Sequence, residues 1–96
     1  MTRKLALNEE YEALAKALPT MKLNEVGQAV LDNWPKVYYA ARPYLDAMLL
    51  LTDISQNFGM DTGKSVVVYF LGNAQTWRGE PARLIKKELK RRAGIR

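Results

Sequence analysis

The chain contains neither cysteine nor histidine in its 96 residues. Without cysteine it forms no disulfide, and without both residue types it lacks the usual ligands of structural zinc. Thiol nucleophiles and imidazole acid–base catalysis are excluded for the same reason. We therefore expect the fold to depend on apolar packing and to need no cofactor and no metal.

Long hydrophobic runs are also missing. The longest uninterrupted apolar run is Val66 to Leu71, whereas a transmembrane helix needs about 20 such residues. Near the N-terminus only Leu5 to Leu7 are consecutively apolar, which is too short for the core of a signal peptide. We therefore expect a cytoplasmic protein that does not associate with membranes.

The length and composition predict one folded domain covering residues 1–96. A chain of this length buries roughly 60–65% of its unfolded surface, which leaves a thin stability margin. Hydrophobic residues make up 48% of the sequence, enough for a small core and too many for a disordered chain. Self-association as a homodimer is one way to extend such a core.

Helical spacing of apolar residues predicts an all-α bundle of about five short helices. Asn8 is positioned to cap the first helix, which Pro19 ends. Asn24 is the expected cap of a second helix that breaks near Pro35.

Pro43 suits the first turn of a third helix, with an apolar stripe that continues to Phe58. Gly59 is the expected left-handed residue at its end, and Asp61 the expected cap of the next helix.

Residues 65–71 are the one ambiguous segment. They are rich in β-branched and aromatic side chains, so an α+β fold with a strand here is the alternative. Helix is favoured because apolar residues continue at helical spacing to Trp77, and because a lone strand leaves its backbone unpaired. The residues at that spacing are Val67, Phe70, Leu71, Ala74 and Trp77.

The last predicted helix covers residues 81–93. Gly79 ends the element before it, Pro81 opens it and Gly94 stops it. Its apolar stripe is narrow and consists of Ala82, Ile85, Leu89 and Ala93. A stripe of this width indicates packing onto the body of the protein rather than insertion into a membrane.

Gly63-Lys64-Ser65 suggests a phosphate-binding loop, but the spacing is wrong. That loop needs a glycine five positions before Gly63, where this chain has Phe58. We interpret these residues as the start of a helix and not as a nucleotide site.

The carboxylates Asp46 and Asp53 lie seven residues apart, which places them on one face of a straight helix. Nothing in the sequence surrounds them with a cleft, so we expect solvated surface rather than a catalytic or metal site. The prediction is a protein that is not an enzyme and has no small-molecule substrate.

The distribution of charge is the strongest functional signal. Residues 78–96 carry eight basic and two acidic side chains, a net charge of +6, whereas residues 1–77 carry a net charge of −1. A basic helix of this kind predicts contact with nucleic-acid phosphates. The candidate residues are Arg78, Arg83, Lys86, Lys87, Lys90 and Arg91. Arg92 is expected to pair with Glu88 instead.

A short basic helix after the turn Arg78-Gly79-Glu80-Pro81 has the outline of the second helix of a helix-turn-helix. The helix has no asparagine or glutamine to read bases, so contact with the phosphate backbone is expected to dominate.

The alternative function is protein interaction, either as an adaptor for an acidic protein surface or as a homo-oligomer. Aromatic residues cluster in the middle of the chain, where core packing is the more common role, but tyrosine and tryptophan near arginine also anchor interfaces. The candidate interface residues are Trp34, Tyr38, Tyr39 and Tyr44.

Overall fold

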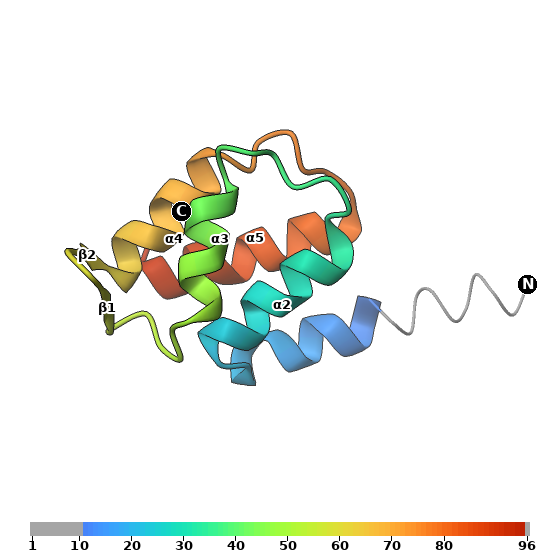
Figure 1. The fold of residues 1–96 in the computed structure, drawn as a ribbon. Helices are drawn as coiled ribbons and strands as arrows, with labels where there is room; N and C mark the ends of the chain where they lie inside the picture. The colour runs from blue at the N-terminus through green and yellow to red at the C-terminus, as the bar shows by residue number, and fades with distance from the viewer. Residues whose placement is uncertain (1–10, 96) are drawn as a thin grey trace, which may run out of the picture.

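The computed structural model describes residues 11–95, which form a helical fold (Figure 1). Residues 11–17 are helical and run into the short 3-10 helix η1 (Leu18–Thr20). The elements that follow are α2 (Leu23–Asn33), α3 (Arg42–Leu49), β1 (Asn57–Phe58), β2 (Asp61–Thr62), α4 (Gly63–Gly72) and α5 (Glu80–Ala93). The predicted all-α class is confirmed, and the antiparallel pair β1–β2 is only a small hairpin. The predicted cap Asn8 lies outside the described residues.

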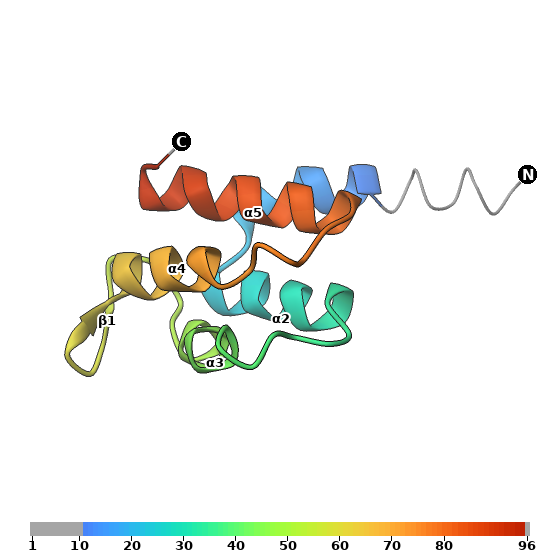
Figure 2. The ribbon, with the colours of Figure 1, turned by 90° about the horizontal axis from the view of Figure 1, so that it is seen from above.

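The helices are arranged in three layers (Figure 2). α3 lies on one side, α2 and α4 lie in the middle, and α5 lies on the other side next to the helical residues 11–17. α4 packs against both α3 and α5, and α2 does the same. One long side of α5 therefore faces away from the body.

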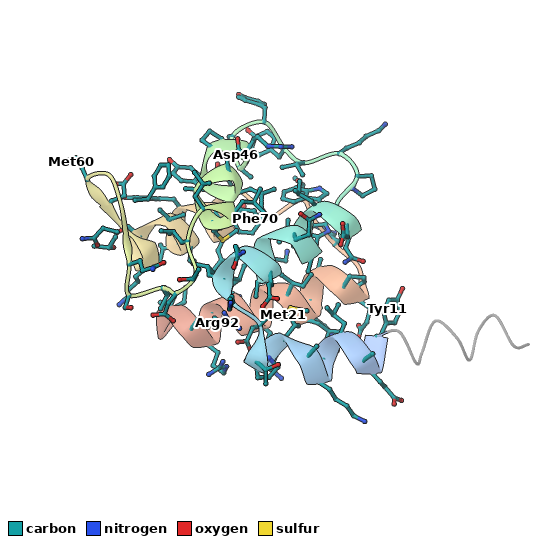
Figure 3. All side chains as sticks on the ribbon, turned by 60° about the horizontal axis from the view of Figure 1, so that its bottom comes forward. Tyr11, Met21, Asp46, Met60, Phe70 and Arg92 are labelled. Atoms are coloured by element: carbon teal, nitrogen blue, oxygen red, sulfur yellow. The ribbon has the colours of Figure 1, made fainter. Side chains whose placement is uncertain are left out.

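The core is formed where α2, α3, α4 and α5 meet. Phe70 of α4 is its largest fully buried side chain and lies in the interior in Figure 3. Trp34 and Trp77 stack with ring centroids 5.1 Å apart, and Phe70 meets the edge of Trp34. This stack joins the loop after α2 to the loop after α4.

The segment 65–71 lies inside α4, so the helical interpretation is correct and the strand alternative is wrong. The predicted continuation to Trp77 is also wrong, because α4 ends at Gly72. Ala74 and Trp77 are buried nevertheless, since the loop 73–79 folds back onto the core. The buried residues of this loop happen to follow α4 at helical spacing, which is why the sequence predicted a longer helix.

The third helix ends at Leu49 and not at Phe58. Side chains of the following turn accept hydrogen bonds from the backbone N–H groups after this helix. The Gln56 carboxamide oxygen accepts from the N–H groups of Thr52 and Asp53, at 2.7 and 3.2 Å. Asp53 accepts from the backbone of Ser55 at 3.0 Å. Side chains of this kind compete with a helix for backbone groups.

The predicted roles of Gly59 and Asp61 are corrected accordingly. Gly59 has the expected left-handed backbone, with φ of 61°, but it lies in the turn of the β1–β2 hairpin. Asp61 belongs to β2, and the cap of α4 is Thr62, whose hydroxyl accepts from the Ser65 N–H at 3.0 Å. Asn24 is likewise not a cap, because α2 begins one residue before it.

The boundaries of α5 follow the sequence closely. Pro81 lies in its first turn, after Gly79 with φ of 110°, and Gly94 ends it in the left-handed conformation with φ of 72°. Its predicted apolar stripe is buried throughout: Ala82, Ile85, Leu89 and Ala93. This packing fixes which side of α5 each basic residue occupies.

Candidate nucleic-acid interface

The outward side of α5 carries most of the predicted phosphate-binding residues. Because the apolar stripe is buried against α2 and α4, the positions on the opposite side are exposed. Those basic positions are Arg83, Lys87, Lys90 and Arg91. The structure places all four on one face, which we call the α5 basic face.

Two of these four side chains are already in ion pairs. Arg83 donates to Glu80 from Nε at 3.0 Å, and Arg91 donates to Glu88 from Nε at 3.1 Å. The arginine side chains remain 59% and 61% exposed, but their partners differ, because the Glu80 side chain is 42% exposed and the Glu88 side chain only 6%. An exposed pair such as Arg83–Glu80 contributes about 0–1 kcal/mol, so a phosphate can replace the Glu80 carboxylate at little cost, whereas Arg91 is held by a buried carboxylate.

Lys87 and Lys90 have no such partner. Within residues 11–95, neither side chain makes an ion pair or a hydrogen bond to another residue. They lie one turn apart, with a rise of roughly 4.5 Å along the helix axis. Both acidic residues of α5 are engaged by arginines, so nothing on the helix itself neutralises these two ammonium groups.

Lys86 has a structural role that the sequence did not indicate. Its ammonium group donates to the carbonyl oxygens of Ala74 at 3.0 Å and Trp77 at 2.6 Å. These bonds tie the loop 73–79 to α5. Burial lowers the pKa of Lys86, and the positive charges of Lys90 and Arg78 lower it further.

Arg92 is a tether within the protein, as its predicted pairing with Glu88 implied. It donates to the Glu88 carboxylate at 2.6 Å, and also to the carbonyl oxygens of Leu18 and Met21 at 2.6 and 2.7 Å. Figure 3 shows Arg92 beside Met21. The guanidinium group therefore joins α5 to η1 and is not part of the α5 basic face.

The predicted helix-turn-helix outline is not observed. α4 ends at Gly72 and α5 begins at Glu80, so the connection is longer than the three- or four-residue turn of that motif. The loop 73–79 between them is packed onto the core through Trp77. The motif therefore gives no argument for insertion of α5 into a major groove.

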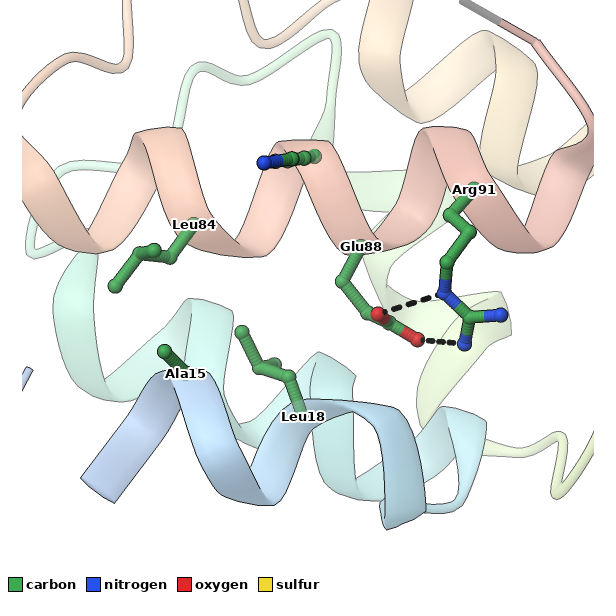
Figure 4. A pocket seen from close by; sticks show the side chains of 6 residues that line it. Ala15, Leu18, Leu84, Glu88 and Arg91 are labelled. Carbon is green, nitrogen blue, oxygen red and sulfur yellow. Dashed lines mark hydrogen bonds and ion pairs between the residues drawn. The ribbon is translucent and has the colours of Figure 1, made fainter. Parts of the chain in front are cut away.

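A hollow of about 290 Å³ lies between the first helical segment and α5 (Figure 4). Ala15, Leu18 and Leu84 give it an apolar lining, and Glu88 and Arg91 lie at one side. The Glu88 carboxylate accepts hydrogen bonds at both oxygens from arginine. A carboxylate held in this way is a poor general base.

The other carboxylates give no site either. Asp46 pairs with Arg42 at 2.9 Å on the surface of α3, and Asp53 is used in the turn after that helix. Among residues 11–95, no three acidic side chains come close enough to hold a metal ion. In the same part of the chain, no helix combines the length and the apolarity needed to cross a membrane.

The predicted aromatic interface divides into buried and exposed members. Trp34 is buried in the core stack, and Tyr44 is partly buried against Tyr69 with ring centroids 5.5 Å apart. Tyr38 and Tyr39 are 41% and 80% exposed, and their rings meet edge to face at 4.9 Å. Of the four predicted interface residues, Tyr38 and Tyr39 are the two with an open aromatic surface.

Comparisons of the chain with protein-family models, with curated proteins and with solved structures find no match.

Proposed function

We propose that the protein is a small non-enzymatic nucleic-acid-binding protein, of an accessory or regulatory kind, that contacts phosphates through the α5 basic face. The observation that carries the proposal is the pair Lys87 and Lys90, exposed on one face and without a partner among residues 11–95. Lysine binds a phosphate as a point charge, and each contact releases counterions from the nucleic acid.

Further cations extend this pair along the same side. Arg83 adds a guanidinium group that can exchange the exposed Glu80 carboxylate for a phosphate, and Arg91 adds an exposed guanidinium group that stays paired with the buried Glu88. Arg78, which is exposed in the loop before α5, continues the positive surface past the start of the helix. Contacts of this type position a nucleic-acid backbone and do not select a base sequence.

The proposal is tested with the variant K87Q/K90Q. Binding of labelled nucleic acid is measured by fluorescence anisotropy from about 50 to 200 mM salt. Each lost phosphate contact reduces the salt slope by about one, so the double variant should bind more weakly with a slope smaller by about two.

The matched control is K22Q/K64Q, which removes the same charge from two exposed lysines outside α5. This control should bind nearly as well as the natural protein. Equal losses in the two variants would mean that only net charge matters, and absence of binding at the lowest salt would refute the proposal.

A second candidate, protein interaction or homo-oligomerisation, is favoured by the exposure of Tyr38 and Tyr39. Tyrosine is frequent among the residues that dominate protein interfaces. Sedimentation of the protein alone, at low and high salt, tests self-association. An apolar dimer persists at high salt, whereas binding to phosphates weakens steeply.

A further inference from the structure

Tyr38 lies beside a hollow with a polar lining, and the ring of Tyr39 meets the ring of Tyr38 edge to face. Tyr38 forms one wall of a cavity of about 300 Å³, and the start of the loop 73–79 forms the other. Asn73, Gln75 and Thr76 line it from that loop. Amide and hydroxyl groups next to an aromatic ring are the groups that recognise an unpaired nucleobase, by hydrogen bonds to its edge and stacking on its face.

The same loop also borders a second, cationic hollow. Its lining includes Trp77 and Arg78 from the loop, and Arg83 and Lys86 from α5. The two hollows are therefore neighbours along one stretch of chain: Gln75 and Thr76 belong to the first, and Trp77 and Arg78 to the second. The second hollow reaches the start of the α5 basic face at Arg83.

We infer that the partner is a single-stranded nucleic acid, whose backbone follows the α5 basic face and Arg78 while unpaired bases stack at Tyr38 and Tyr39. The inference rests on the proposed function and names its ligand class. Aromatic side chains next to a line of cations are typical of surfaces that bind single strands. A duplex keeps its bases stacked and paired, so it offers phosphates to α5 but no free base to the tyrosines.

The surroundings of the tyrosines favour a nucleobase over a protein partner. The hollow beside Tyr38 is lined mainly by polar groups, which offer hydrogen-bond partners to the edge of a base. Lys36, two residues before Tyr38, is exposed and adds a positive charge. A polar hollow, an aromatic ring and a nearby positive charge suit a nucleotide, which carries both a base and a phosphate.

The test compares the natural protein with Y39A and Y39F, using a labelled single strand and a duplex of the same length. Tyr39 is 80% exposed, so both variants should fold. Loss of one stacked base weakens single-strand binding about 5- to 100-fold in Y39A. Y39F keeps the ring and should bind like the natural protein. Duplex binding should be weaker than single-strand binding in the natural protein and unchanged by either variant.

The outcomes separate this inference from the proposed function. If the duplex binds as tightly as the single strand, or if Y39A leaves single-strand binding unchanged, the inference is overturned while the α5 basic face stands. If Y39A instead abolishes self-association seen by sedimentation, the tyrosines belong to a protein interface and the inference also falls. If neither nucleic acid binds at about 50 mM salt, both proposals fail together.

Discussion

Gly63, at the residue scale, shows why a glycine can be required without any ligand. It is buried at the start of α4, and its N–H donates to the Gln56 carbonyl oxygen at 2.7 Å. A Cβ atom at this position would lie 2.9 Å from that same oxygen and closer still to the carbonyl oxygen of Ile54. Both neighbours are backbone atoms, so the clash cannot be relieved by a side-chain rotation.

The substitution G63A should therefore destabilise the protein, although alanine is the better helix former. Overpacking of this kind typically costs about 1–3 kcal/mol. The control is G72A at the other end of α4, where a Cβ would meet nothing within 4 Å. That change should be neutral or stabilise by up to about 1 kcal/mol. Urea denaturation of both variants measures the difference, and equal stability would contradict the packing role of Gly63.

The same residue explains the resemblance to a phosphate-binding loop. Gly63 is needed for close approach to the turn before it, Lys64 is exposed, and the Ser65 N–H is bonded to the Thr62 hydroxyl. The wrong spacing of the glycines could be recognised from the sequence. The steric requirement for glycine at position 63 could not be recognised from the sequence, because Ile54 and Gln56 approach this residue only after the turn has folded.

At the scale of elements, the contact between α5 and η1 depends on charged groups. Burial raises the pKa of the Glu88 carboxyl, but hydrogen bonds from Arg91 and Arg92 outweigh it, so the net pKa lies below the ordinary value. A carboxyl whose pKa falls on folding stabilises the folded state above its unfolded pKa of about 4.3. The contribution is lost as the pH falls through the folded value.

The variant E88Q should consequently be less stable at pH 7 by about 3 kcal/mol. This is the lower end of the range for breaking a buried ion pair, chosen because Arg91 is exposed. Its deficit relative to the natural protein should shrink as the pH falls from 7 through the folded pKa of Glu88, because the carboxylate then loses its charge in the natural protein. Urea denaturation over a series of falling pH values measures this, and a deficit that does not change with pH would show that the charge is not responsible.

The elements that the sequence predicted well are those with local signals. Pro43 and Pro81 in first turns, Gly94 at the end of α5 and the narrow apolar stripe all act within a few residues of the chain. The end of α3 was missed because its stop signal is a set of side-chain bonds from Asp53 and Gln56. An Asp followed two residues later by Ser is a turn signal that could have been read there.

At the scale of the whole molecule, the positive charge of residues 78–96 is gathered on and next to α5, but the individual cations have different roles. The six predicted basic residues could be identified from the sequence alone. Seven of the eight basic residues at positions 78–96 lie in α5 or in the loop that precedes it. The sequence could not show which of these cations face solvent and which bond within the protein. Lys86 bonds to the loop 73–79, which packs onto the core through Trp77, and Arg92 bonds to η1. Only contacts between distant segments separate binding cations from tethering ones.

This division determines which experiment can identify the interface. A chain that ends at Gly79 would lose the whole of α5, including Ile85 and Leu89, both fully buried. Each such side chain contributes about 1.5–3 kcal/mol, and the facing surfaces of α2 and α4 would be uncovered as well. Because a small domain has only about 5–15 kcal/mol of stability, the shortened protein should be unfolded.

Far-UV circular dichroism with thermal melting measures this, and we expect little helix and no cooperative transition. A cooperative melt with helical signal would show that α5 is dispensable for the fold. If the shortened protein is unfolded, its failure to bind nucleic acid carries no information about the basic face. Substitutions that leave the core intact, K87Q/K90Q and Y39A, are then the changes that separate binding from folding.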